Sequence, residues 1–249
     1  PELSYNTYSP LNNPIISGLY YRLLFTITMC NDYLKQTTDE RLNDRGVDDA
    51  LRANIQYYRS ETRFLRALMY YHAMDMFGNT PFITENDPIG TYLPPQRSRA
   101  ELYSFIESEL LELSDDPHMT EPRQNEYGRA DKAAVWMLLS RLYLNAEVYI
   151  QTPKYDECMK YARNVISAGY DLCPNYAELF MADNGENTDA RKEMIFTINF
   201  DGRWTQSYAT QFLVAGSRGP NDPNFTQTSG ISKSFKGSRA TLTFVRHFY

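Results

Sequence analysis

The most constraining feature of the sequence is a long helical pattern that carries aromatic side chains on opposite sides. Apolar periodicity predicts a helix from about residue 47 to residue 77, with Gly78 as its stop. At about 100° per residue, Phe64 falls on one side, whereas Tyr70 and Phe77 fall on the other. A helix with aromatic side chains on opposite faces is packed on both of them. The chain is therefore expected to place this helix in the middle of a layered helical structure.

Several polar side chains lie along the same helix and raise the question of a metal site. Glu61 is eleven residues from His72, about 16 Å along the axis at about 1.5 Å per residue, so the two cannot share an ion. His72 and Asp75 alone supply two ligands, whereas a zinc or iron site needs at least three. We therefore predict no metal site and interpret His72 and Asp75 as a buried polar pair. Arg63 and Arg66 are expected to meet carboxylates of neighbouring helices.

The same periodicity predicts four further helices, at residues 15–36, 98–114, 131–150 and 154–168. Ser98 and Glu101 are spaced as a capping box at the start of the second of them. Thr152 and Pro153 are expected to cap and open the last one.

The last two predicted helices have tetratricopeptide character. They are joined by a short turn and show the pattern A-A-x-x-x-L-L followed by Y-x-x-C-x-x-x-A, although no second copy recurs at a fixed period. We expect the two helices to be antiparallel. The predicted core face of the last helix consists of Tyr155, Cys158, Met159, Ala162, Val165 and Ile166.

The character of the sequence changes after Gly169. Residues 193–201, EMIFTINFD, alternate apolar and mixed positions and predict a half-buried strand. Beyond it the chain is rich in Gly, Ser, Thr, Asn and Pro and shows no long helical pattern. The predicted fold class is therefore mainly α. We expect a single domain over 1–249, in which tetratricopeptide-like helices over 15–169 pack against a loop-rich part with short strands over 170–249.

Composition narrows the function classes. A net charge of −6 with scattered lysines and arginines offers no basic stripe for nucleic acid. No apolar run is long enough to span a bilayer. The three histidines lie beside no recognisable nucleophile, and no glycine-rich phosphate loop occurs. The 20 tyrosines suit a surface that both packs and hydrogen-bonds, which favours binding. We predict neither a cofactor nor an enzymatic activity.

The segment ETRFLRALMYYHAMDMFGNTPFITE resembles the signature helix of the SusD/RagB family, the nutrient-binding outer-membrane lipoproteins of Bacteroidetes. The matching positions are Glu61, Arg63, Phe64, Leu65, Arg66, Ala67, Tyr70, Tyr71, Phe77, Gly78 and Pro81. Later segments are similar to the family in the same order: SRAELYSFIESEL, GRADKAAVWMLLSRLYL, YDECMKYARNVISAGYDLCPNYAELF and EMIFTINF. The resemblance extends from the first predicted helix to the end of the chain.

The resemblance implies a mostly α-helical protein with tetratricopeptide-like pairs on one side and an irregular ligand-binding region on the other. It implies a surface-exposed lipoprotein of the cell outer membrane that binds glycans without catalysis and hands them to a SusC-like TonB-dependent transporter. Family members are longer, and this chain lacks an initiator Met and stops within an apolar segment. We therefore expect the N-terminal portion of a longer chain. Its signal peptide and lipidated cysteine, the sole membrane attachment, would precede Pro1.

A glycan site needs flat aromatic platforms with polar groups at their edges, held on loops of a rigid scaffold. Two loops qualify. The first follows the expected strand and contains Asp201, Arg203, Trp204, Gln206 and Tyr208. The second, LSYNTY, precedes the first helix and contains Tyr5, Asn6 and Tyr8. Trp204 could equally be a packed loop residue, whereas a platform must be at least partly exposed.

Two other function classes stay open. An intracellular tetratricopeptide scaffold that binds proteins or peptides would show further regular helix pairs after Gly169. A carbohydrate-active enzyme of helical fold would need two carboxylates that face a cleft. The loop-rich part offers few acids for that chemistry, because Asp201 and Asp222 are isolated.

Overall fold

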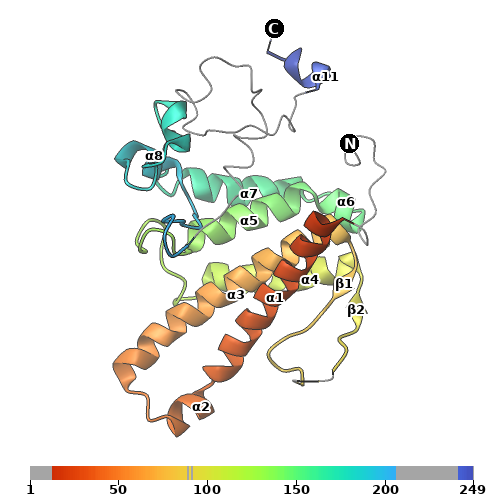
Figure 1. The fold of residues 1–249 in the computed structure, drawn as a ribbon, viewed down its shortest axis with the longest axis vertical. Coiled ribbons are helices and arrows are strands. Elements are labelled where there is room, and N and C mark those ends of the chain that lie inside the picture. The colour runs from red at the N-terminus through yellow and green to blue at the C-terminus, as the bar shows by residue number, and fades with distance from the viewer. Residues whose placement is uncertain (1–12, 89, 91, 206–240, 249) are drawn as a thin grey trace. The chain divides into compact units, whose positions relative to one another are not determined.

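The computed structural model describes residues 13–88, 90, 92–205 and 241–248 (Figure 1). The chain divides into two compact units, Pro1–Thr197 and Ile198–Tyr249. The described elements of the first unit are α1 (Pro14–Gln36), α2 (Asp39–Asp44), α3 (Asp49–Phe77), β1 (Thr80–Pro81), β2 (Gln96–Arg97), α4 (Arg99–Asp115), α5 (Lys132–Leu144), α6 (Ala146–Ile150), α7 (Tyr155–Ile166), η1 (Tyr176–Phe180) and α8 (Thr188–Glu193). The described part of the second unit contains α11 (Leu242–Val245).

Helix α3 is the central helix of the first unit, as its aromatic pattern predicts. It packs against α1 and α4, α4 packs in turn against α5, and α5 packs against α7 (Figure 1). Buried side chains of α3, among them Phe64, Tyr70 and Met74, join those of α4 and α5 in one apolar core. Each large side chain buried in this way stabilises the fold by about 1.5–3 kcal/mol. The mainly helical fold class is confirmed.

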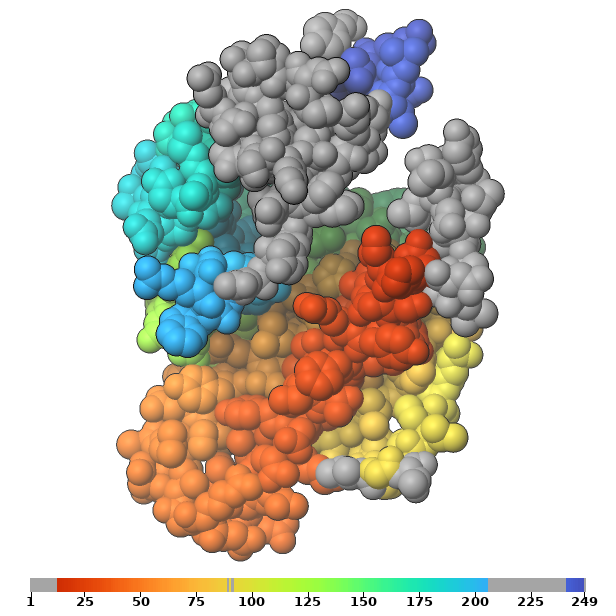
Figure 2. All heavy atoms as spheres, viewed as in Figure 1, coloured from red at the N-terminus to blue at the C-terminus, as the bar shows by residue number. Residues whose placement is uncertain are grey.

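Helix α1 covers one flank of α3 and has two unlike faces. Ile27 and Leu34 on its inner face are fully buried, whereas Tyr21, Phe25 and Met29 on its outer face are exposed. Figure 2 shows α1 along the surface of the molecule, next to α3 and the segment that leads to α4. The predicted helix over residues 15–36 is therefore confirmed, with one face of its apolar pattern turned to solvent.

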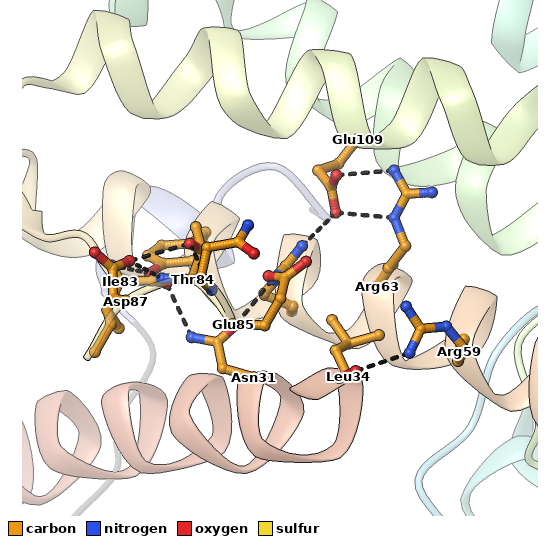
Figure 3. A network of polar contacts seen from close by, with 12 residues as sticks. Asn31, Leu34, Arg59, Arg63, Ile83, Thr84, Glu85, Asp87 and Glu109 are labelled. Carbon is orange, nitrogen blue, oxygen red and sulfur yellow. Dashed lines mark hydrogen bonds and ion pairs between the residues drawn. The ribbon is translucent and has the colours of Figure 1, made fainter. Parts of the chain in front are cut away.

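An ionic network joins α1, α4 and the segment after β1 to α3 (Figure 3). The Arg66 side chain is 3% exposed, donates to Oδ1 of Asn31 and Oε2 of Glu109 at 2.9 Å each, and is paired with Glu85. Arg63 pairs with Glu109 at 2.8 Å. A buried charge is tolerated only with partners of this kind. The prediction that both arginines meet carboxylates of neighbouring elements is confirmed.

The backbone of Ile83 is held by the same network. Tyr70 donates its hydroxyl hydrogen to the Ile83 carbonyl at 2.7 Å and accepts the Ile83 N–H at 2.9 Å. Asn31 Nδ2 donates to the same carbonyl at 2.9 Å. Burial raises the pKa of Tyr70 to about 12, so this phenol remains a donor throughout the physiological range. The segment between β1 and β2 is thereby fixed to α1 and α3.

The turn between α3 and α4 follows the predicted chemistry. Gly78 ends α3 with a φ of 72°, and a Cβ at this position would lie 3.3 Å from the Arg99 guanidinium. Ser98 Oγ accepts the N–H of Glu101 at 3.3 Å, and the Glu101 carboxylate accepts the N–H of Ser98 at 2.8 Å. The capping box is therefore present, and the antiparallel pair of β1 and β2 brings the two helix ends together.

The expected antiparallel pair is formed by α5 and α7. The Tyr170 hydroxyl, beyond the end of α7, donates to Asp131 at the start of α5, 3.1 Å away. Further along, Ser140 of α5 donates to the Cys158 carbonyl of α7 at 3.3 Å. These contacts place the end of one helix beside the beginning of the other. The prediction that these two helices pair antiparallel is confirmed.

Two helix predictions need correction in their ends. The single helix predicted over 131–150 is broken at Asn145, whose Nδ2 donates to the Arg141 carbonyl at 3.2 Å. A side-chain bond of this kind competes with the helical backbone bond, which explains the break. Thr152 and Pro153 do not open the last helix, because α7 begins after Lys154, which makes no side-chain cap.

The predicted core face of α7 is confirmed for Cys158, Ala162 and Val165, which are buried or half-buried, and is wrong for the other three residues. Tyr161 and Val165 are its buried residues, and the Tyr161 ring stacks on Tyr143 of α5 with centroids 5.8 Å apart. Met159 and Ile166, both assigned to the core, are exposed, as is Tyr155. Apolar residues cover one broad arc of this helix, and the sequence period alone does not say which side of the arc meets α5.

The strand predicted over residues 193–201 is also wrong. Glu193 is the last residue of α8, and the segment that follows adopts no regular structure and pairs with no strand. Phe196 packs on Phe64 with ring centroids 5.4 Å apart, whereas Ile198 and Phe200 are 66% and 56% exposed. Alternation makes a strand only where a neighbour can accept its backbone hydrogen bonds. Among the described residues, no strand pairs with the segment after Glu193.

Candidate functional site

The predicted binding loop after residue 200 is a hydrogen-bonded turn. One carboxylate oxygen of Asp201 accepts the backbone N–H groups of Arg203 and Trp204 at 2.8 Å each and that of Thr205 at 3.0 Å. Gly202 adopts a φ of 74° and donates its N–H to the Thr205 carbonyl at 3.0 Å. The bond from Thr205 and those from Arg203 and Trp204 lower the pKa of the Asp201 carboxyl below its ordinary value. The turn is thus fixed mainly by the Asp201 side chain, which binds the backbone of the following residues.

Trp204 is presented outward by this turn. Its side chain is 90% exposed, so the ring meets the condition that the sequence sets for a platform. Asp201 and Arg203 precede it in the chain and are exposed as well. The Asp201 carboxylate, expected at the edge of a bound sugar, instead uses one oxygen to hold the turn. The structure therefore brings three of the predicted site residues together.

The other predicted site residues lie outside the described part of the chain. They are Tyr5, Asn6, Tyr8, Gln206 and Tyr208. Their role remains a sequence-based expectation.

The interpretation of His72 and Asp75 as one buried polar pair is wrong. Asp75 is exposed and accepts a hydrogen bond from the Tyr149 hydroxyl at 2.6 Å, which joins α3 to α6. His72 is half-buried, and burial lowers its pKa below the ordinary value, with the Arg141 charge acting in the same direction. Glu61, near the middle of α3, pairs with Arg129. Within the described residues, no three His, Cys, Asp or Glu side chains lie close enough to hold a metal ion.

Two cavities in the first unit were not foreseen from the sequence. One, of about 370 Å³, lies between α1 and the segment after β1, and its wall includes Met29, Asp32, Lys35, Glu85 and Tyr92. Its walls are about fifty residues apart in the chain, which no local pattern connects. It offers an aromatic ring beside carboxylates and an ammonium group.

The other cavity, of about 290 Å³, lies among the loop before α5, the segment after α7 and α8. Arg123, Tyr127, Tyr170 and Arg191 are in its wall. The sequence signal for this cavity is weak, because these residues come from two separate loops and from α8. Among the described helices, none combines the length and apolar character needed to cross a bilayer.

Comparison with known proteins gives several matches, although no protein-family model matches the chain. The chain is 42% identical to the starch-binding protein SusD of Bacteroides thetaiotaomicron over 250 aligned residues, which take in the whole chain and 42% of that protein. It is 24% identical to a SusD-like protein of Bacteroides ovatus over 182 residues, 70% of this chain and 32% of the relative. The chain thus spans less than half the length of the curated relatives it matches.

A solved structure with a xylogluco-oligosaccharide shares the fold. It matches 92% of this chain and 45% of its own chain, with a TM-score of 0.66 and 21% identity. The surface glycan-binding protein A of Bacteroides uniformis matches 74% of this chain and 38% of its own, with a TM-score of 0.58 and 26% identity. The helical arrangement described above is therefore that of known carbohydrate-binding structures.

Proposed function

Since this chain belongs to the SusD family, we propose that it is part of a protein that binds glycans at the cell surface and does not cleave them. The observation that carries the proposal is the 42% identity to a starch-binding protein along the whole chain. Starch-type α-glucans are therefore the first ligands to test.

The turn at Trp204 supports this function physically. A sugar ring presents a C–H face that stacks on an aromatic ring, and its hydroxyl groups then need polar partners at the ring's edge. Trp204 offers such a face, with Arg203 next to it in the chain, and the Asp201 carboxylate holds the backbone of the turn. A ring presented by a fixed turn loses little conformational freedom on binding.

The same turn gives little support for catalysis. Cleavage of a glycosidic bond requires two carboxyl groups placed on either side of it. Asp201 is the single acid of the described turn, and one of its oxygens is committed to three backbone N–H groups. We therefore propose that the protein binds glycans and does not cleave them.

Membership of the family also underlies our proposals for partner and location. We place the full-length protein at the cell outer membrane, facing outward and held by an N-terminal lipid. There it would pass glycans to a SusC-like TonB-dependent transporter. Co-purification of such a transporter with the full-length protein from native membranes tests the partnership, and antibody labelling of intact cells tests the location.

The binding function is tested by calorimetric titration of the full-length protein with maltoheptaose, followed by chromatography of the incubated sugar. We expect saturable binding and unchanged maltoheptaose. Absence of binding to maltoheptaose and to xylogluco-oligosaccharide would contradict the glycan proposal. Product formation that one carboxylate substitution abolishes would contradict the absence of catalysis.

An intracellular tetratricopeptide scaffold is not favoured. That alternative expects further helix pairs after Gly169. In the part of the chain that the structure describes beyond Gly169, η1, α8 and α11 are at most six residues long.

A further inference from the structure

The cavity before α5 brings two aromatic rings and two guanidinium groups together in the first unit. Arg191 lies over the Tyr127 ring, with its Cζ 4.4 Å from the ring centroid. Arg123 lies over the Tyr170 ring at 5.4 Å, and its Nη1 donates to the Gly169 carbonyl at 2.5 Å. Stacking of this kind holds a guanidinium in place without neutralising its charge.

The buried carboxylate in the cavity wall, that of Asp131, is engaged in other hydrogen bonds. One oxygen of Asp131 accepts the N–H groups of Ala133 and Ala134, at 2.9 Å and 3.2 Å. The other accepts the backbone N–H of Arg123 at 2.8 Å and the Tyr170 hydroxyl at 3.1 Å. The Asp131 carboxylate therefore closes the loop and caps α5.

A third arginine in the cavity wall differs from these two because it has carboxylate partners. Arg129 is paired with Glu61 of α3, and Glu126 approaches it to 3.8 Å. Within the described residues, neither Arg123 nor Arg191 has a carboxylate within ion-pair distance. In the part of the chain that the structure describes, two cations without an ion-pair partner thus face one cavity, whose wall also contains Asp131 and Glu126.

Arg123 also has an uncommon backbone conformation. Its φ is 61°, in the left-handed region that a residue with a Cβ rarely adopts. The hydrogen bond from its N–H to Asp131 holds the backbone there. The loop thereby directs the Arg123 side chain toward Tyr170 and the cavity.

We propose that this cavity binds a carboxylate-bearing sugar of the uronic acid type, at a site distinct from the Trp204 turn. A guanidinium group matches a carboxylate with two parallel N–H bonds, and two such groups are present. A volume of about 290 Å³ exceeds what a small inorganic anion fills, and Met194 and Ile195 supply an apolar wall for the C–H face of the ring. The choice of a sugar as the ligand class rests on the proposed function.

The test uses the full-length protein and ligand-observed NMR titrations with D-glucuronate, D-glucose and inorganic phosphate. We expect glucuronate to bind at least about tenfold more tightly than glucose or phosphate, and its affinity to fall as salt is added. Arg191→Gln should weaken glucuronate binding about tenfold or more, because it removes a charge-assisted contact. Arg163→Gln, on the exposed side of α7, is the matched control and should leave the affinity unchanged.

Each remaining outcome counts against the proposal. Equal affinity for glucuronate and glucose would overturn a role for the guanidinium groups, and equal affinity for phosphate would overturn the sugar class. Glucuronate binding that survives both Arg191→Gln and Arg123→Gln, in variants with wild-type melting temperatures, would place the ligand elsewhere. Maltoheptaose titration of the wild type keeps the two proposals separate. Failure of glucuronate alone refutes the cavity site, whereas failure of maltoheptaose alone counts against the α-glucan proposal.

Discussion

The polar groups of α3 and those of the Asp201 turn find their hydrogen-bond partners in opposite ways. Arg63 and Arg66 form ion pairs with carboxylates on other elements, and these pairs hold the elements together (Figure 3). Asp201 instead accepts N–H groups from its own turn, and the Trp204 ring is left exposed. Polar residues among aromatics are thus structural when they bond across elements. An aromatic held by local backbone bonds remains available to a ligand.

The largest effect is expected in the network of α3. Arg66→Met keeps much of the side-chain volume but leaves Glu85 and Asn31 without their arginine partner. Breaking a buried ion pair in this way should lower the free energy of unfolding by about 3–5 kcal/mol, measured by urea denaturation. Arg63→Met is the matched control, because that side chain is 25% exposed and should cost less. Equal losses in the two variants would contradict the central place given to Arg66.

Next in size is the effect of removing the exposed ring. Trp204→Ala should weaken glycan binding by roughly 1–3 kcal/mol, the scale of one aromatic contact, with little change in melting temperature. A packed tryptophan would instead cost about 3–5 kcal/mol of stability. Calorimetric titration and thermal melting of the same variant separate the two cases. Unchanged affinity would remove Trp204 from the proposed site.

A smaller effect on stability is expected at Tyr70. Tyr70→Phe removes the hydroxyl that bonds both backbone groups of Ile83. The Ile83 carbonyl keeps its bond from Asn31, so the N–H alone loses its partner. We expect a loss of about 1 kcal/mol in urea unfolding. A loss as large as that of Arg66→Met would show that the hydroxyl, rather than the ion pairs, dominates the network.

The smallest effect is expected in the pH dependence of the melting temperature, to which Glu109 contributes. Burial alone raises the pKa of Glu109, but the hydrogen bonds and charges of Arg63 and Arg66 outweigh it, so the pKa lies below its ordinary value. A carboxyl with a lowered folded-state pKa stabilises the protein above its unfolded-state pKa, and that contribution is lost as pH falls through the folded-state pKa. The melting temperature should therefore fall below about pH 4.3, and less steeply in Glu109→Gln. Parallel pH profiles would mean that Glu109 does not contribute.

Much of the helical part could be predicted because its signals are local. The stop at Gly78, the capping box of Ser98 and Glu101 and the extent of α1 and α3 depend on residues a few positions apart. The ion pairs of Arg66 could be expected in kind, since a charge on an aromatic helix needs a partner. The identity of the carboxylate partners could not be predicted, because Glu85 and Glu109 approach Arg66 from different elements.

Of the candidate site, the sequence pointed to Trp204 without deciding whether it is exposed, and it pointed to neither cavity. By itself it determined the order and approximate length of the main helices, the family, and an aromatic after residue 200, because periodicity, caps and motif spacing are read along the chain. The tertiary structure decided which side of α7 is buried, that residues 194–200 form no strand, and that Arg123 and Arg191 meet at one cavity. These outcomes depend on which distant segment supplies a neighbour, a hydrogen-bond partner or a counterion, and that neighbour is chosen only when the chain packs.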